Sequence, residues 1–144
     1  MLVHQILKSK GSEGVLTVKP NTLVSEAAKI LAEKRIGTVL VSEDGSTPLG
    51  ILSERDIVRE LAKRGVGCMS DKVEDYMTTE LVTCGRNDDA VTVLEKMTKG
   101  HFRHMPVMED GAVVGLISLG DTVKARLSEL AMEKDALQGM IMGH

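Results

Sequence analysis

Two seven-residue stretches, Gly50–Asp56 (GILSERD) and Gly115–Asp121 (GLISLGD), decide the fold of this chain. Each begins with a glycine, continues through apolar residues that suit a buried strand, and reaches a serine that can cap a helix. An aspartate follows three residues after each serine. Because glycine, serine and aspartate recur at one spacing, the chain is predicted to contain an internal repeat.

Other segments recur around these stretches in the same order. Val15–Val18 (VLTV) returns as Leu81–Cys84 (LVTC), and the acidic turn Glu43–Gly45 (EDG) returns as Glu109–Gly111 (EDG). The Asp-Gly pair in each turn is typical of a hairpin, because glycine tolerates positive φ. The predicted strands are Val15–Val18, Thr38–Val41 and Leu49–Ser53 in the first copy, and Leu81–Thr83, Met105–Met108 and Val113–Ser118 in the second.

Two amphipathic helices complete the repeated unit. Apolar residues recur at helical spacing from Val24 and again from Ala90, and Asn21 or Thr22 is the predicted cap of the first helix. A further helix is expected to start near Glu54 and Leu119. The fold class is therefore mixed α+β, with β-α-β-β-α occurring twice. We expect the two copies to pack face to face with pseudo-two-fold symmetry, because one copy alone buries too little surface. This packing would leave two equivalent clefts.

The sequence period predicts three segments. Residues 1–66 hold the first repeat with a helical lead-in, residues 67–127 hold the second repeat, and residues 128–144 form a helical tail. Apolar residues from Val123 to Ile141 alternate in steps of four and three, which is a heptad spacing interrupted at Lys134. This helix could lie on its own domain or contact a second copy of the chain.

Composition excludes several classes of protein. The chain has 144 residues, a formal net charge of -3, one Tyr, one Phe and no Trp. Nucleic-acid binding is not expected, because a basic excess and stacking aromatics are both missing. No apolar run is long enough for a membrane span, and no secretory signal is visible, so we expect a cytoplasmic protein. Cys68 and Cys84 are predicted to be reduced thiols, and no metal site is expected.

These motifs carry a family resemblance. The segments are Val73–Thr78 (VEDYMT), Arg103–Val107 (RHMPV), the two acidic turns and the two glycine-to-aspartate endings. Together they resemble a pair of cystathionine-β-synthase (CBS) domains, also called a Bateman module, from Val3 to about Lys124. The ending of the first copy is similar to that of short stand-alone bacterial CBS-pair proteins.

The strand-to-helix junctions suggest a ligand. Free N–H groups at a helix N-terminus suit an anion, and the hydroxyls of Ser53 and Ser118 add donors there. Asp56 and Asp121 can each accept hydrogen bonds from a ribose diol, although a plain helix-capping role is the alternative. The resemblance implies the ribose role, and it implies that Thr17 and Thr83 frame an adenine pocket rather than serve only as strand residues.

Basic residues are needed to balance ligand phosphates. Arg55 and the pair Arg103–His104 are the candidates, and relatives place the latter pair near phosphates; ordinary surface charge is the alternative. The first copy departs from this pattern, with Gly37–Thr38 in place of the pair, while Gly120 replaces Arg55. The two clefts are therefore predicted to differ in affinity or preference. The predicted ligand-binding residues are Thr17, Thr38, Ser53, Arg55, Asp56, Thr83, Arg103, His104, Pro106, Ser118 and Asp121.

The resulting hypothesis is a non-catalytic regulatory module. It would bind AMP, ADP, ATP, NAD(H) or S-adenosylmethionine, need no cofactor, form a homodimer and act on a separately encoded partner. An enzyme is not expected, because no nucleophile–base set and no Walker-type loop appear in the sequence. The alternative is a structural or adaptor homodimer that binds no ligand.

Overall fold

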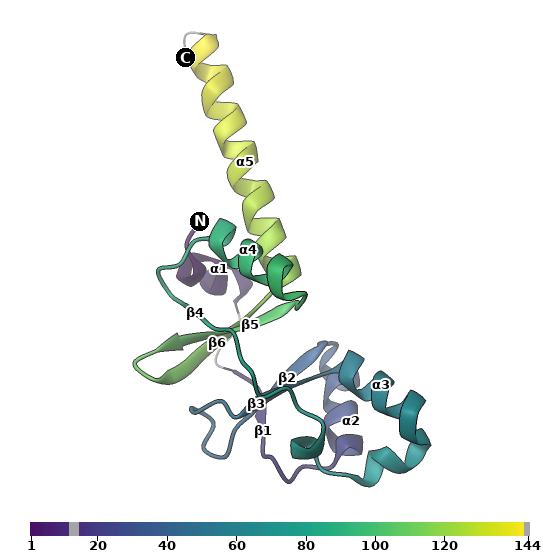
Figure 1. Ribbon diagram of the computed structural model, residues 1–144. Helices are drawn as coiled ribbons and strands as arrows, with labels where there is room; N and C mark the ends of the chain where they lie inside the picture. The colour runs from purple at the N-terminus through teal and green to yellow at the C-terminus, as the bar shows by residue number, and fades with distance from the viewer. Residues whose placement is uncertain (12–14, 143–144) are drawn as a thin grey trace. The chain divides into compact units, whose positions relative to one another are not determined.

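The computed structural model describes residues 1–11 and 15–142, and its chain divides into two compact units (Figure 1). Unit 1 comprises Met1–Glu13, Val82–Met108 and Gly115–His144, and unit 2 comprises Gly14–Leu81 and Glu109–Val114. Each unit is built around a three-stranded sheet with helices, so the predicted mixed α+β class is confirmed. The boundaries of the three segments, residues 1–66, 67–127 and 128–144, come from the sequence repeat and stay a prediction.

Unit 2 contains the body of the first repeat. Its elements are β1 (Thr17–Val18), α2 (Val24–Lys34), β2 (Thr38–Val41), β3 (Gly50–Ser53), α3 (Glu54–Arg64) and two 3₁₀ segments, η1 (Gly65–Ser70) and η2 (Val73–Asp75). The sheet order is β1-β2-β3, with β1 parallel and β3 antiparallel to β2. Val18, Val39, Val41 and Leu52 on the sheet pack against Ala27 and Leu31 of α2, which gives this unit its apolar core.

Unit 1 contains the body of the second repeat. Its elements are α1 (Val3–Lys10), β4 (Cys84–Gly85), α4 (Ala90–Gly100), α5 (Leu119–Ile141) and parts of β5 (His104–Glu109) and β6 (Ala112–Ser118). The end of β5, the turn after it and the start of β6, Glu109–Val114, are assigned to unit 2. The predicted hairpin turn joins β5 to β6, and both Asp110 and Gly111 have positive φ, as the Asp-Gly pair requires. The buried residues of this unit include Ile6, Val93, Met97, Met105 and Ile117.

The lead-in of each repeat packs on the body of the other repeat. The backbone N–H of Val3 donates to the carbonyl of Asp88 at 2.8 Å, and that of Val73 donates to the carbonyl of Thr22 at 2.8 Å. Asp88 and Thr22 stand at equivalent positions of the two repeats, so Val3 and Val73 are equivalent positions of the two lead-ins. The two lead-ins differ in form, however, because the first is the helix α1 and the second contains only the short segment η2.

The predicted cap of α2 is wrong, and this second lead-in is the reason. Neither Asn21 nor Thr22 caps the helix, whose N-cap is Leu23 without a side-chain hydrogen bond. The carbonyl of Asp71 instead accepts from the N–H of Val24 at 2.9 Å. A backbone carbonyl from the lead-in therefore satisfies a donor that a capping side chain would otherwise take.

The predicted strand Leu81–Thr83 is also wrong, because β4 lies at Cys84–Gly85. In the first repeat the equivalent strand begins at Thr17, which pairs with Leu40. Pro106 stands at the position of Leu40, and Pro106 has no N–H to donate to the neighbouring strand. The ladder therefore starts one residue later in the second repeat.

Helix α5 combines a packed part with an exposed part. Thr122 and Ala125 are buried, and α5 packs on α1 and α4. Beyond Leu130 nearly every described side chain is exposed, and Figure 1 shows this part of α5 extending past α1 and α4. The heptad residues Val123, Leu127, Leu130, Leu137 and Ile141 are all exposed.

Candidate functional site

The Asp56 junction, Gly50–Asp56, joins β3 to α3 through reciprocal capping. Ser53 is the N-cap, and its hydroxyl accepts from the N–H of Asp56 at 3.2 Å. One carboxylate oxygen of Asp56, Oδ2, accepts from the N–H of Ser53 at 2.9 Å. The predicted serine cap is confirmed, and the capping box holds the aspartate in the first helical turn. Asp56 is only 7% exposed, so its carboxylate needs these partners.

The Asp121 junction, Gly115–Asp121, repeats this geometry between β6 and α5. The Ser118 hydroxyl accepts from the N–H of Asp121, and Asp121 Oδ2 accepts from the N–H of Ser118, both at 3.0 Å. Partial burial pushes the pKa of Asp121 upward, but hydrogen bonds from Lys10 and Ser118 outweigh burial, so its pKa lies below the usual value. The carboxylate is therefore ionised at neutral pH.

Strand register places three predicted residues on one face of the sheet in unit 2. Thr38 lies opposite Ser53, and Thr17 lies opposite Leu40. Because side chains alternate along a strand, Thr17, Thr38 and Ser53 share a face. The apolar core of this unit uses the other face, through Val39, Val41 and Leu52. These three predicted residues of the first repeat are therefore gathered on the sheet face opposite the core.

The predicted residues of the second repeat lie at equivalent positions in unit 1. His104 and Pro106 alternate along β5, so they share a face, and the carbonyl of Arg103 accepts from the N–H of Leu119 at 2.7 Å. In the first repeat the carbonyl of Gly37 accepts from Glu54 in the same way. The carbonyl of Thr83 accepts from Lys96 Nζ at 3.3 Å.

The two aspartates have basic partners that the sequence analysis did not find. Arg59 Nη2 lies 2.6 Å from Asp56 Oδ1, and Lys10 Nζ lies 2.9 Å from Asp121 Oδ2. The spacing of Asp56 and Arg59 on one helix could have revealed the first pair. Nothing local links Lys10 to Asp121, because they are far apart in the sequence. The predicted phosphate ligands Arg55 and Arg103 are both exposed, and His104 is half-buried.

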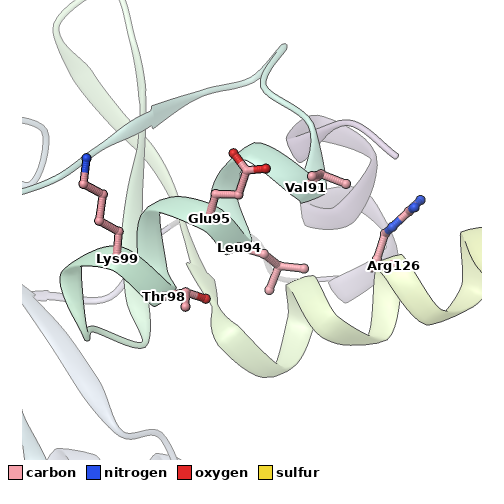
Figure 2. Close-up of a pocket in the computed structure, with 6 residues that line it drawn as sticks. All are labelled: Val91, Leu94, Glu95, Thr98, Lys99 and Arg126. Carbon is pink, nitrogen blue, oxygen red and sulfur yellow. The ribbon is translucent and has the colours of Figure 1, made fainter.

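A shallow groove of about 500 Å³ lies between α4 and α5, away from the predicted ligand residues. Figure 2 shows Leu94 of α4 directed toward α5, with Val91 on the same helix and Arg126 on α5. Glu95, Thr98 and Lys99 complete the lining. The lining is mainly apolar and lacks a convergent set of polar groups, which does not suit a nucleotide.

Two further searches cover residues 1–11 and 15–142. Within these ranges no cluster of three or more His, Cys, Asp or Glu side chains could hold a metal ion. No helix of this described part is long and apolar enough to cross a membrane.

Comparison with known families decides the classification. A sequence description of the CBS domain matches residues 11–63 and again residues 73–128, which together make up most of the chain. The chain belongs to the CBS-domain family. Each CBS match ends beyond one of the two capped junctions, so the repeat read from the sequence is a pair of CBS domains.

Two similar proteins match this chain along most of their own length. The CBS domain-containing protein CBSX3, mitochondrial, of Arabidopsis thaliana is 30% identical over 98% of this chain and 72% of its own. A crystal structure of a CBS-domain containing protein from Agrobacterium tumefaciens, ATU1752, is 40% identical with a TM-score of 0.83, covering 88% of this chain and 99% of that one.

Two structural relatives carry adenosine compounds. The CBS domain pair of protein MJ0100, in complex with 5′-methylthioadenosine and S-adenosyl-L-methionine, is 27% identical with a TM-score of 0.78 and covers 90% of this chain and 98% of its own. The CBS domain protein PAE2072 from Pyrobaculum aerophilum, complexed with AMP, is 25% identical with a TM-score of 0.77 and covers 92% and 99%.

Proposed function

We propose that this CBS pair is a non-catalytic sensor that binds an adenosine-containing ligand and passes its ligand state to a separate protein. The observation that carries the proposal is the recurrence of a capped serine–aspartate junction in both repeats. Relatives in complex with AMP, S-adenosylmethionine and 5′-methylthioadenosine support the ligand class. AMP, ADP, ATP, NAD(H) and S-adenosylmethionine are the candidates, because all contain adenosine.

The chemistry of the junctions fits a nucleoside. An ionised carboxylate only accepts hydrogen bonds, so Asp56 and Asp121 suit the two hydroxyls of a ribose and repel a phosphate. Thr17, Thr38 and Thr83, with Pro106, would frame the base, while Ser53 and Ser118 keep the aspartates in place. Arg55, Arg103 and His104 would meet the phosphates, which are anionic and need basic or N–H partners.

A thermal-shift screen tests this proposal. The purified protein is heated with adenine and guanine nucleotides, NAD(H) and S-adenosylmethionine, in parallel with Asp56→Ala and Asp121→Ala. A ligand at 100 times its dissociation constant adds about 2.7 kcal/mol of stability. We expect stabilisation by at least one adenosine compound and its loss in an aspartate variant. No stabilisation of the folded protein by any compound would contradict the proposal.

A sensor must transmit its ligand state to another protein. We propose that this chain forms a homodimer whose geometry changes with the bound ligand. A ligand can change the shape or pairing of the protein only if it binds two states with different affinity. The exposed apolar residues of α5 and the neighbouring α4–α5 groove are suited to a second copy of this chain. Large exposed apolar surfaces commonly mark interaction sites.

The alternative function, a structural or adaptor homodimer that binds no ligand, would use the same surface. One pair of variants tests whether the dimer forms through it. Leu137 is 58% exposed at a heptad position, whereas Ala136 is exposed beside it at a non-heptad position. We expect Leu137→Glu to shift the mass measured by light scattering toward the monomer and Ala136→Glu to leave it unchanged. A dimer that binds no adenosine compound would favour the adaptor. A wild-type monomer would contradict both dimer readings.

A further inference from the structure

Lys10, the last residue of α1, lies at the Asp121 junction. Its Nζ donates to the carbonyl oxygen of Leu116 at 3.0 Å and pairs with Asp121 Oδ2 at 2.9 Å. A lysine ammonium has three N–H donors, so these two contacts leave one donor without a described protein partner. The Lys10 side chain keeps 30% of its exposure, which leaves room for a ligand atom.

Lys10 and a backbone N–H bind the same oxygen of the Asp121 carboxylate. The Ser118 N–H and Lys10 Nζ both lie at Oδ2, and the Ser118 hydroxyl also interacts with the carboxylate. Among the described residues no N–H and no basic side chain lies at Oδ1, and the Asp121 side chain is 23% exposed. The junction therefore presents a carboxylate acceptor and an ammonium donor next to each other. A hydroxyl group can use both at once, because it donates one hydrogen bond and accepts another.

The Asp56 junction lacks this pair. Arg59 occupies Asp56 Oδ1, comes from the same helix and is 52% exposed. Counted from the matched valines Val3 and Val73, the position of Lys10 is Glu80 in the second lead-in, and Glu80 is exposed. A cation contributed by a lead-in is therefore found at the Asp121 junction, whereas the described partners of Asp56 come only from its own junction and helix.

We propose that Lys10 is a ligand-contacting residue that, with Asp121, recognises the ribose diol and makes the Asp121 junction the more selective of the two for ribose. One hydroxyl donates to Asp121 Oδ1 and accepts from the third N–H of Lys10. The charge on both partners strengthens these hydrogen bonds. This assignment rests on the proposed nucleotide function and adds a residue from outside the repeated motif.

The test compares AMP with 2′,3′-dideoxy-AMP, which has the same phosphate and base and lacks both hydroxyls. Binding is measured by calorimetry on Asp56→Ala, Asp56→Ala/Lys10→Met and Asp56→Ala/Lys8→Met, so that only the Asp121 junction is read. Lys8 lies on the same helix and is exposed, so Lys8→Met removes the same charge without touching Asp121. Circular dichroism confirms that each variant is folded.

We expect Lys10→Met to weaken AMP binding about tenfold and to change binding of the dideoxy analogue less than about twofold. Lys8→Met should alter neither. Equal weakening of both compounds would mean that Lys10 acts only by charge and would overturn the assignment. Unchanged or tighter AMP binding would overturn it as well. If wild type and Asp56→Ala both bind no AMP and no other adenosine compound, the proposed function fails and this assignment fails with it.

Discussion

The Asp56 and Asp121 junctions have the same backbone and different electrostatics. Both use a serine N-cap, an aspartate at the third helical position and a backbone hydrogen bond to the residue just before the central strand. Asp56 is paired with an arginine of its own helix, whereas Asp121 is paired with a lysine from α1. The comparison shows that a sequence repeat can fix local geometry while neighbouring segments set the charge around it.

A similar contrast separates the two glycines that begin the junctions. A Cβ on Gly50 would lie 2.9 Å from the backbone carbonyl oxygen of Thr78 and 2.7 Å from Met77 Sδ. A Cβ on Gly115 would meet only side-chain atoms of Leu7, at 2.7 and 2.9 Å for its two methyls. Both glycines are required for close packing, but one faces rigid backbone and the other a side chain that can rotate.

The largest expected effects come from the core residues at equivalent positions, Leu52 and Ile117. Both are fully buried, so Leu52→Ala and Ile117→Ala should each lower the free energy of unfolding by about 2–5 kcal/mol. Because each lead-in packs on the body of the other repeat, we expect both variants to shift one cooperative transition in urea, followed by circular dichroism.

Val66→Ala is the control for these variants, since Val66 lies outside α5, is 82% exposed and should change little. Two separate transitions, each moved by only one variant, would show that the halves are energetically independent. In that case the exchange of lead-ins would contribute nothing to cooperativity.

The next effect distinguishes the glycines. Inserting a methyl group into a packed site costs about 1–3 kcal/mol, depending on whether the neighbours can move. Gly50→Ala should lie near the upper end, because the Thr78 carbonyl cannot rotate away, and Gly115→Ala near the lower end. Gly67→Ala serves as the control, because no atom would lie within 4 Å of its Cβ. Equal losses for Gly50→Ala and Gly115→Ala in urea unfolding would contradict this account.

Much of the backbone could be predicted because its signals are local. The Asp110–Gly111 turn, the serine caps and the central strand Thr38–Val41 follow from residue type and spacing within a few positions. The failures have non-local causes. The cap of α2 is replaced by a carbonyl of Asp71, and β4 is displaced by the missing N–H of Pro106 on the neighbouring strand.

The candidate site divides in the same way. The sequence places Ser53, Asp56, Ser118 and Asp121 at helix starts, and the structure confirms these positions; their role toward a ligand stays a prediction. Lys10 could not be predicted, because its contact with Asp121 depends on how α1 packs beside α5. The electrostatic difference between the junctions is therefore a property of tertiary structure.

The smallest expected effect tests the Lys10–Asp121 pair through pH. The pKa of Asp121 is lower in the folded protein than in the unfolded chain, where it is about 3.9. The pair therefore stabilises the fold fully above that value, and this contribution is lost as pH falls through the folded pKa. Asp121→Asn keeps a capping oxygen but removes the charge. Because the pair is partly exposed, the loss of charge in Asp121→Asn should lower the free energy of unfolding by less than about 1 kcal/mol relative to the wild type.

We expect the melting temperature of Asp121→Asn to be lower than that of the wild type at pH 6, and the gap to narrow toward pH 3. Asp135→Asn is the control, since Asp135 is an exposed acid on the same helix, α5. When Lys10→Met is already present, adding Asp121→Asn should lower the melting temperature at pH 6 by less than it does in the wild type. The reason is that Lys10→Met has already removed the other half of the pair. A gap between Asp121→Asn and the wild type that is independent of pH would show that Asp121 acts on stability only as a cap. The two junctions would then be electrostatically alike in their effect on folding despite their different partners.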